Sequence, residues 1–179
     1  LIPLAQGCEE LEAVTVIDLL RRAGVDVVTA GLEEGLVKCS RGTVIMPDTV
    51  LDEVLGESFD MIVLPGGLPG ADHLDADARI HRLLRDMAEQ GRYTAAICAA
   101  PKVLGSAGLL DGRTATSYPG ILEGGNFGLT SLSSQPVVRD GAVITSRGPG
   151  TAMDFALELI EVLCGPAQRH AVEAPLVRS

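Results

Sequence analysis

One cysteine lies where a thiol could act as a nucleophile. Cys98 follows the apolar run Tyr93–Ile97 and precedes Ala99-Ala100-Pro101, which predicts a strand, a sharp turn and a helix that begins near Pro101. This is the layout of a nucleophile elbow, with cysteine in place of serine and small neighbours beside it. Backbone N–H groups at the start of a helix favour a thiolate, so we expect a lowered pKa at Cys98 and not at the other cysteines. An inert buried cysteine would suit the same local sequence.

A second candidate is a carboxyl group near the start of the first predicted helix, Glu9–Ala23. Glu12 lies beside the apolar stripe of this helix, so its side chain can point inward, toward the ends of the strands. A first-turn glutamate can also simply interact with the helix dipole, as we expect for Glu9 and Glu10. The sequence is therefore compatible both with a role for Glu12 in proton transfer and with a purely structural role.

Two glycine-containing loops also follow predicted strands. Gly66 and Gly67 come after the apolar run Met61–Leu64, where the backbone can approach a ligand and offer N–H groups, although a plain turn is an alternative. The glycine spacing is not a dinucleotide fingerprint. The later Ser-Arg-Gly-Pro-Gly-Thr loop contains Arg147, which can hold an anion or a partner chain, and Thr151, a plausible N-cap.

The cysteines and histidines do not have the spacing of metal ligands. There is no CxxC pair among Cys8, Cys39, Cys98 and Cys164, and the histidines are scattered at positions 73, 81 and 170. This pattern predicts no metal site and no disulfide framework, and it is typical of reduced thiols in the cytoplasm. We expect the acidic stretch Asp72–Asp77 to be a solvated loop.

The predicted secondary structure places these residues at one edge of a sheet. Apolar runs alternate with helical patterns, which predicts a mainly parallel sheet with helices on both faces. We expect strands at 1–4, 25–30, 36–39, 43–46, 61–64, 93–97, 137–139 and 142–145. We expect helices at 9–23, 51–55, 78–90, 101–107 and 151–163, and one more within 165–179. Ligands of such sheets bind outside the carboxyl ends of the strands, where the loops named above lie.

The composition favours one globular domain, spanning residues 1–179, over a disordered chain. Hydrophobic residues make up 46% of the 179 residues. The formal net charge of −10, without a Lys/Arg cluster, disfavours nucleic acids and anionic membranes as partners. No apolar run is long enough to span a membrane, and no secretory signal is visible. We therefore expect a cytoplasmic protein.

Four segments, taken together, resemble one family. LAQGCEELEAV, VLPGG, AAICAAP and TSRGPGT, in that order, are similar to segments of the ThiJ/PfpI superfamily. Within it, they most resemble the branch that contains bacterial YajL and the human Parkinson-disease protein deglycase. The resemblance extends from Leu4 to about Pro175.

The resemblance implies a fold and a reactive pair. It implies an α/β fold, a flavodoxin-like three-layer sandwich, that forms a homodimer. Cys98 would be the reactive cysteine, and Glu12 its hydrogen-bonding partner, which would hold a proton beside the thiolate. This agrees with the repulsion expected between two adjacent negative charges. The oxyanion donors would be the backbone groups of Gly67 and Ala99.

The resemblance also brings other residues to the site, with two departures. Arg22 and Arg41 would approach it across the dimer, and Arg147 would lie nearby. Many relatives have a histidine where this chain has Tyr118, which leaves Glu12 as the proton carrier. Protease-like members have a histidine directly after the cysteine, and Ala99 at that position argues against peptidase activity.

The function implied is a cofactor-free enzyme of carbonyl and oxidative stress defence. It would convert reactive 2-oxoaldehydes, such as methylglyoxal to lactate, without metal or glutathione, or remove early glycation adducts. The alternative is a redox-sensing chaperone in which Cys98 oxidises to a sulfinate. Amidotransferase-like chemistry ranks last because no suitable histidine is visible.

Overall fold

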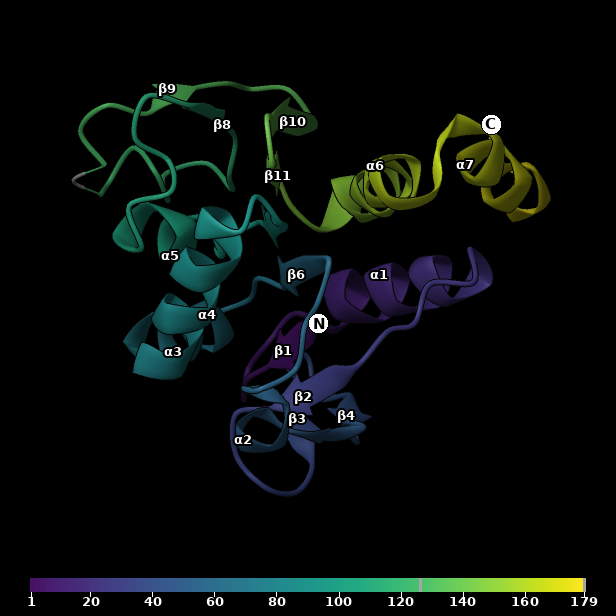
Figure 1. The fold of residues 1–179 in the computed structure, drawn as a ribbon, viewed down its shortest axis with the longest axis horizontal. Coiled ribbons are helices and arrows are strands. Elements are labelled where there is room, and N and C mark those ends of the chain that lie inside the picture. The colour runs from purple at the N-terminus through teal and green to yellow at the C-terminus, as the bar shows by residue number, and fades with distance from the viewer. Residues whose placement is uncertain (126, 179) are drawn as a thin grey trace.

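A twisted sheet lies between two layers of helices in the computed structural model, which describes residues 1–125 and 127–178 (Figure 1). The main strands are β1 (Ile2–Leu4), β2 (Thr29–Gly31), β5 (Thr49–Val50), β6 (Met61–Leu64), β7 (Tyr93–Ile97), β10 (Val137–Asp140) and β11 (Val143–Ser146). They lie in the order β5-β2-β1-β6-β7-β11-β10, with β1 joined to β6 by a hydrogen bond from the Val63 N–H to the Leu1 carbonyl at 2.9 Å. The paired strands run parallel except β10, which is antiparallel to β11. Read along the chain, the parallel core is the 2-1-3-4-5 order of a flavodoxin-like fold, as predicted.

Short strands outside this core differ more from the expectation. The predicted hairpin is present as β3 (Val37–Lys38) and β4 (Val44–Ile45), while β5 and the parallel pair β8 (Thr114–Ala115) and β9 (Ser131–Leu132) were not predicted. The prediction of a strand from Val25 was wrong at its start. The β-branched run favours extended backbone, but only Thr29–Gly31 pairs with β1.

The helices form the two outer layers. On one side of the sheet lie α1 (Glu10–Arg22), α6 (Ala152–Cys164) and α7 (Pro166–Glu173), and on the other lie α3 (Gly70–Ala76), α4 (Ala78–Glu89) and α5 (Pro101–Ser106) (Figure 1). The short helix α2 (Leu51–Val54) follows β5, and two 3₁₀ turns occupy Pro149–Thr151 and Ala174–Leu176. The predicted C-terminal helix therefore ends early, and Ser179 lies outside the described residues.

The acidic stretch predicted to be a loop is helical. Residues 72–76 belong to α3, because Ala71 and Leu74 are fully buried and anchor one face of that helix. Asp77 is the N-cap of α4, where its carboxylate accepts a hydrogen bond from the Arg79 N–H at 2.8 Å. The carboxylates that suggested a solvated loop are thus the polar side of a packed helix.

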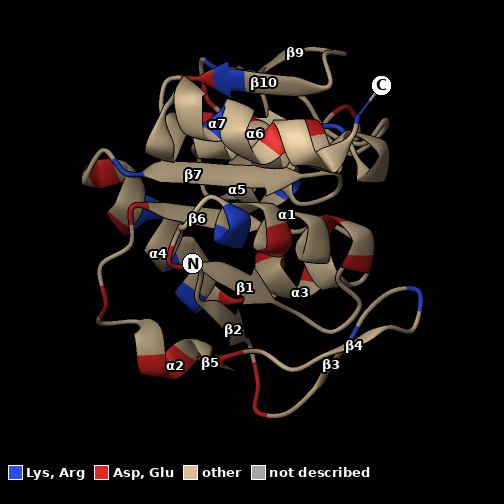
Figure 2. Cartoon of the chain, turned by 90° about the vertical axis from the view of Figure 1, so that its right-hand side faces the viewer, with Lys and Arg blue, Asp and Glu red and all other residues tan. Residues whose placement is uncertain are grey.

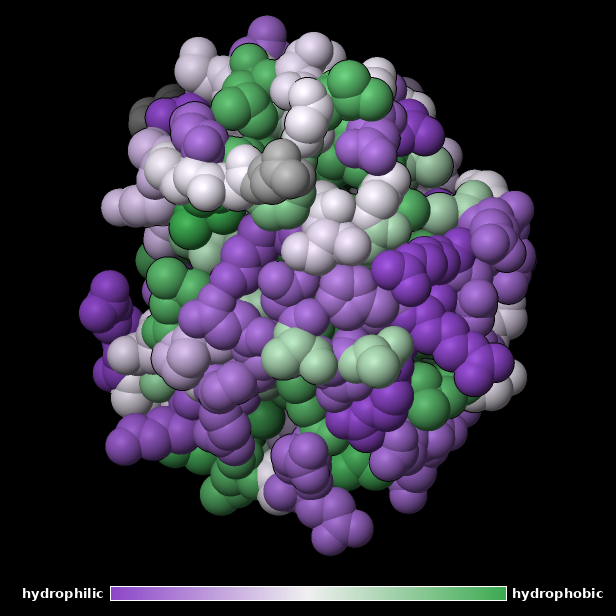
Figure 3. Space-filling model, turned by 90° about the vertical axis from the view of Figure 1, so that its left-hand side faces the viewer, coloured by the Kyte–Doolittle hydropathy of each residue, from purple (hydrophilic) through white to green (hydrophobic). Residues whose placement is uncertain are grey.

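Burial follows the layers. All four residues of β6 are buried, as expected for a strand covered on both faces, and Phe155 of α6 is among the largest fully buried side chains. Hydrophilic residues dominate the middle of the face formed by α3 and α4 (Figure 3). Acidic and basic residues are interspersed along the ribbon in Figure 2. Among the described residues, no helix is long and apolar enough to cross a membrane.

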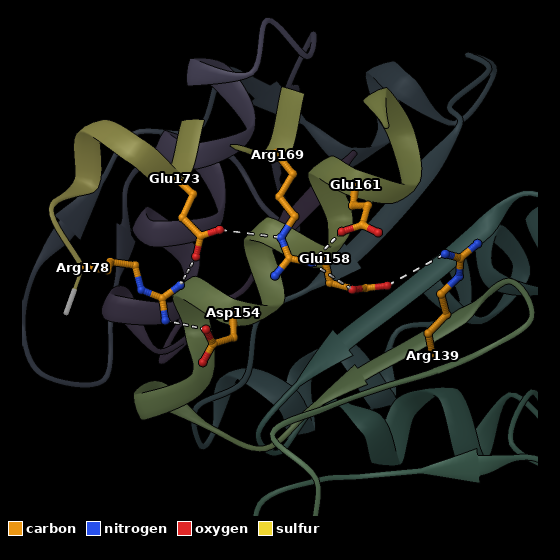
Figure 4. A network of polar contacts seen from close by, with 7 residues as sticks. All are labelled: Arg139, Asp154, Glu158, Glu161, Arg169, Glu173 and Arg178. Carbon is orange, nitrogen blue, oxygen red and sulfur yellow. Dashed lines mark hydrogen bonds and ion pairs between the residues drawn. The ribbon is translucent and has the colours of Figure 1, made fainter. Parts of the chain in front are cut away.

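A network of ion pairs holds the C-terminal helix in place (Figure 4). Arg169 of α7 pairs with Glu161 at 2.5 Å and approaches Glu158 and Glu173 at 3.9 Å. Arg178 pairs with Asp154 and Glu173, and Arg139 of β10 reaches Glu158 at 3.8 Å. The network therefore links β10, α6 and α7.

Candidate functional site

Cys98 occupies the sharp turn between β7 and α5. Its φ is 64°, in the left-handed region that non-glycine residues rarely adopt. The turn is held on both sides, because the Cys98 N–H donates to the Ser146 carbonyl at 2.9 Å and the Cys98 carbonyl accepts from the Tyr118 N–H at 2.8 Å. Only 8% of the residue is exposed. The predicted elbow geometry is therefore confirmed.

Glu12 points inward from the first turn of α1. Its backbone N–H donates to the side chain of Glu9, the N-cap residue, at 2.8 Å. The residue is fully buried, and its Oε2 accepts a hydrogen bond from the Gly66 N–H at 2.9 Å. Oε1 is also buried and has no conventional hydrogen-bond partner. Glu12 is therefore a buried carboxyl group held by the loop after β6, and not a solvated residue that only interacts with the helix dipole.

The loop after β6 brings the two side chains together. A Cβ at Gly66 would lie 2.7 Å from the Cβ of Cys98, 2.8 Å from Oε2 of Glu12 and 2.8 Å from the Ile97 carbonyl oxygen. Gly67 has a φ of 85°, and a Cβ there would lie 2.5 Å from the Glu9 nitrogen. Because side chains at these positions would push the loop away, glycine is what allows Cys98 and Glu12 to share one small volume.

Burial dominates the electrostatics of this pair. It raises the pKa of Glu12 to about 7, against the lowering effect of hydrogen bonds with Cys98 and the Gly66 N–H. Burial also raises the pKa of Cys98, and the charge of ionised Glu12 adds to it, giving about 12, while the N–H groups of Gly67 and Ala99 act in the opposite direction. The prediction of a lowered pKa at Cys98 is therefore wrong, chiefly because the thiol is buried. The sequence identifies the N–H groups but not how deeply both acids are buried.

Glu12 and Cys98 are two buried acids in contact, and burial raises the pKa of each. An ionised Glu12 carboxylate would be buried with only the Gly66 N–H and the Cys98 thiol as donors, which is costly. A protonated carboxyl removes the repulsion and can donate its O–H to the thiolate. The thiolate is in turn the form that the N–H groups of Gly67 and Ala99 favour. This arrangement places a thiol and a carboxyl group that can exchange a proton within one contact.

Two other predicted residues, Tyr118 and Arg147, are close to Cys98 through backbone hydrogen bonds. Tyr118 donates its N–H to the Cys98 carbonyl, half of the residue is exposed, and a Cβ at Gly148 would lie 3.4 Å from its ring. Arg147 follows Ser146, whose carbonyl accepts from Cys98, and its own N–H donates to the Pro136 carbonyl. Both therefore border the site.

Two predicted arginines lie away from Cys98 in this chain. Arg22 is at the far end of α1 and pairs with Asp18, and ten residues of helix separate it from Glu12 by roughly 15 Å. Arg41 lies in the turn between β3 and β4, where its N–H donates to the Glu10 carboxylate at 3.0 Å. The structure of one chain therefore does not bring them to the site.

Sequence reasoning missed the residues that support the pair through their backbones. The Ser146 carbonyl receives the Cys98 N–H because β11 lies beside β7, and the Gly66 carbonyl accepts from the Glu9 N–H at 2.9 Å. Thr151 stands at the N-cap of α6, but its hydroxyl bonds Ser146 at 2.7 Å and does not cap that helix. No periodicity signals such contacts, since they join segments that are distant in the sequence.

Neither a metal cluster nor the most prominent cavity belongs to this site. Within 1–125 and 127–178, no group of three or more His, Cys, Asp or Glu residues is placed to hold a metal ion. A cavity of about 500 Å³ lies at the amino ends of the strands, lined by residues that include Ile2, Val28 and Phe59. It is at the opposite edge of the sheet from Cys98 and is separate from the Cys98–Glu12 pair.

Comparisons with known proteins give matches over most of the chain. A model of the DJ-1/PfpI family matches residues 1–162. The chain is 46% identical to Protein dj-1beta of Drosophila melanogaster over 178 residues, which cover 99% of this chain and 95% of the relative. The crystal structure of Drosophila melanogaster DJ-1beta superposes with a TM-score of 0.95 at 43% identity, covering 99% and 96% of the two chains.

The names of two further relatives mention an activity and an oxidised state. The chain is 37% identical to the "Glutathione-independent glyoxalase DJR-1.2" of Caenorhabditis elegans, with 96% of this chain and 91% of the relative covered. It also superposes on the structure named "Toxoplasma gondii DJ-1, oxidized" with a TM-score of 0.94 at 38% identity, covering 99% and 97% of the chains.

Proposed function

Since the chain belongs to the DJ-1/PfpI family, we propose that it is a cysteine-dependent enzyme that converts reactive 2-oxoaldehydes to hydroxy acids, methylglyoxal to lactate being the representative reaction. The observation that carries this proposal is the buried contact of Glu12 with Cys98 over Gly66. A glyoxalase among the relatives supports the same reaction class. A cytoplasmic setting, where thiols stay reduced, suits this chemistry.

The reaction follows from a nucleophile and one mobile proton. The Cys98 thiolate adds to the aldehyde carbon, and the new oxyanion takes the proton from Glu12, which gives a hemithioacetal. Ionised Glu12 then removes the proton from that carbon and returns a proton to the adjacent carbonyl carbon, while the hydroxyl proton moves to the former ketone oxygen, which gives a thioester of lactate. Water hydrolyses the thioester and restores the thiol. The sum is methylglyoxal plus water to lactate, without net oxidation.

Neighbouring groups have defined roles in this proposal. The N–H groups of Gly67 and Ala99, which act on the Cys98 sulfur, are placed to stabilise negative charge that forms next to it. The Gly66 N–H holds Oε2 of Glu12, so that the other carboxyl oxygen remains for the proton. Tyr118 and Arg147 border the site and are proposed as contacts for the substrate.

The test is lactate formation from methylglyoxal in the absence of glutathione. We expect Cys98→Ser to lose turnover and Glu12→Gln to lose about 10²- to 10⁴-fold, the usual contribution of general acid–base catalysis. Glu89→Gln, at an exposed position near the end of α4, is the matched control and retains activity. Equal rates for wild type and Cys98→Ser would remove Cys98 from the reaction. Near-native turnover in Glu12→Gln would make Tyr118 the next base to test.

The second candidate function is a redox sensor or chaperone without physiological turnover. It is favoured by the N–H groups of Gly67 and Ala99, which can also stabilise a Cys98 sulfinate, and by the relative named as oxidized. Intact mass after mild peroxide distinguishes the two functions when combined with the lactate assay. A gain of two oxygens at Cys98 in a protein that makes no lactate would favour the sensor.

Removal of free aldehyde imitates deglycation, so a deglycase assay requires preformed adducts with the aldehyde trapped.

We also propose that the functional form is a homodimer. Support comes from Leu11 and Val14, neighbouring apolar residues on α1 that are 50% and 47% exposed. The exposed side of α1 and the Arg147–Gly150 loop are the proposed contact elements. In a dimer, Arg22 and Arg41 could serve the partner's site even though they lie away from Cys98 in their own chain.

A further inference from the structure

A second pair of sulfur atoms meets away from Cys98. Sγ of Cys8 lies 3.6 Å from Sγ of Cys39, and the two residues are 0% and 4% exposed. Cys8 lies in the loop between β1 and α1, and Cys39 follows β3, 31 positions later. The two thiols are thus in direct contact, although their separation in the sequence predicted no disulfide.

Backbone hydrogen bonds hold this contact from both sides. The Gly7 N–H donates to the Lys38 carbonyl, and the Ser40 N–H donates to the Cys8 carbonyl, each at 2.8 Å. The Glu10 carboxylate adds bonds from the Ser40 hydroxyl and from backbone N–H groups of the same turn. The main chains that carry the two cysteines are therefore held side by side.

We propose that Cys8 and Cys39 are a redox modification site, at which a hydroperoxide oxidises the two thiols to a reversible disulfide. A disulfide places its sulfur atoms about 2.05 Å apart, so each side chain needs only a small rotation from the present contact. The bond would covalently join the β3–β4 hairpin to the start of α1. This inference is independent of the proposed turnover at Cys98.

The oxidation proceeds in two balanced steps. The Cys39 thiolate attacks one oxygen of hydrogen peroxide, the O–O bond breaks, and one water is released after protonation, which leaves a sulfenic acid. The Cys8 sulfur then attacks the sulfenic sulfur, the S–O bond breaks, and a second water leaves. Two thiols lose two electrons and two protons, and one peroxide becomes two waters. Reduction by another thiol reverses the change.

The structure assigns the first attack to Cys39. Cys8 has no exposed surface, whereas Cys39, in the turn between β3 and β4, is 4% exposed. Burial raises the pKa of both thiols, and the nearby Glu10 carboxylate acts in the same direction. The reduced pair therefore reacts slowly at neutral pH, and the reaction is best observed at about pH 8, where more thiolate is present.

The test uses a variant in which these are the only cysteines. Cys98→Ser/Cys164→Ser protein is treated with hydrogen peroxide at about pH 8 and measured by intact mass. We expect the loss of two hydrogens, a cross-linked peptide pair that contains Cys8 and Cys39, and full reversal by a thiol reductant. Adding Cys8→Ser should replace this product by oxygen additions at Cys39. Circular dichroism verifies that each variant is folded.

Specific outcomes would overturn the proposal. They are an unchanged mass, oxygen additions on both cysteines of the two-cysteine variant, or a disulfide formed only between two chains. Hydrogen exchange provides the second readout, and we expect slower exchange over residues 37–45 after oxidation. Unchanged hydrogen exchange over residues 37–45 would show that oxidation does not join the β3–β4 hairpin to the start of α1. Because Cys98 is absent, neither result depends on whether the protein turns over methylglyoxal.

Discussion

The backbone N–H of Gly66 donates a hydrogen bond to Oε2 of Glu12 at 2.9 Å, and this bond fixes the buried carboxyl beside the thiol of Cys98. Gly66 follows β6, Glu12 lies on α1 and Cys98 follows β7, so three separate segments converge at the carboxyl edge of the sheet. The missing side chain at Gly66 is what allows this convergence. The chemistry of the pair therefore depends on a residue that contributes only its backbone.

A methyl group at Gly66 should damage the site. Gly66→Ala places a Cβ within 2.8 Å of Oε2 of Glu12 and 2.7 Å of the Cβ of Cys98, so the loop or the pair must move. We expect a loss of roughly 1–3 kcal/mol in the free energy of unfolding and about a 100-fold lower turnover. Gly56→Ala is the matched control, since a Cβ there meets nothing within 4 Å. Equal behaviour of the two variants in urea unfolding and the lactate assay would contradict this.

The raised pKa of Glu12 makes stability depend on pH. Burial raises it from the usual 4.5 to about 7, so the folded protein holds the proton at pH values where the unfolded chain has released it. The stabilisation is fully present below about pH 4.5 and is lost as the pH rises through about 7, a change on the order of 3 kcal/mol.

Glu12→Gln should remove that dependence, because an amide does not ionise. We expect its melting temperature to improve relative to wild type as the pH rises from about 5 to 8. Calorimetry on both proteins at each pH gives the comparison. A difference that stays constant over this range would show that Glu12 does not titrate with a raised pKa in the folded protein.

The same substitution should shift the ionisation of Cys98. If protonated Glu12 donates to the thiolate, Gln replaces a strong O–H donor by a weaker N–H donor, so thiolate formation should move to higher pH. The measurement is ultraviolet thiolate absorbance on a Cys8→Ser/Cys39→Ser/Cys164→Ser protein, with and without Glu12→Gln. A shift to lower pH would mean that Glu12 is ionised when the thiol loses its proton, and that its charge is what opposes the thiolate.

The proposed dimer depends on the exposed apolar residues of α1. Val14→Glu places a charge at a residue that is 47% exposed and should produce monomers at micromolar concentration in light scattering. Leu132→Glu, at a 49% exposed leucine on β9, is the control and should leave the mass unchanged. A monomeric wild type would exclude the dimer, and a dimeric Val14→Glu protein would exclude this face.

The ion-pair network of α7 should stabilise the fold in a salt-dependent way. Arg169 contacts three carboxylates, so Arg169→Gln should cost roughly 1 kcal/mol in the free energy of unfolding at low salt and less at about 1 M salt, where charges are screened. Arg82 meets only Asp86, at 3.6 Å on an exposed surface, so Arg82→Gln should have no measurable effect. A loss at Arg169 that is independent of salt would point to packing of its side chain instead.

The sequence predicted the elements that local patterns encode. The strands Met61–Leu64 and Tyr93–Ile97 and the helix after Pro101 were placed correctly, because apolar runs, periodicity and a proline at the helix start are local signals. The strand Thr49–Val50 and the pair β8–β9, each two residues long, were missed. The helix α3 was missed because its aspartates concealed the burial of Ala71 and Leu74.

What the sequence determined by itself is most of the longer strands and helices and the position of Cys98 at an elbow, because these depend on adjacent residues. The tertiary structure decided how the acids behave. Glu12 and Cys98 are 86 positions apart, and only the parallel packing of β1, β6 and β7 buries them together and raises the pKa of both. The same holds for Cys8 and Cys39, which come into contact through hydrogen bonds between a loop and a hairpin. Burial and proximity arise from long-range packing, and no local pattern carries them.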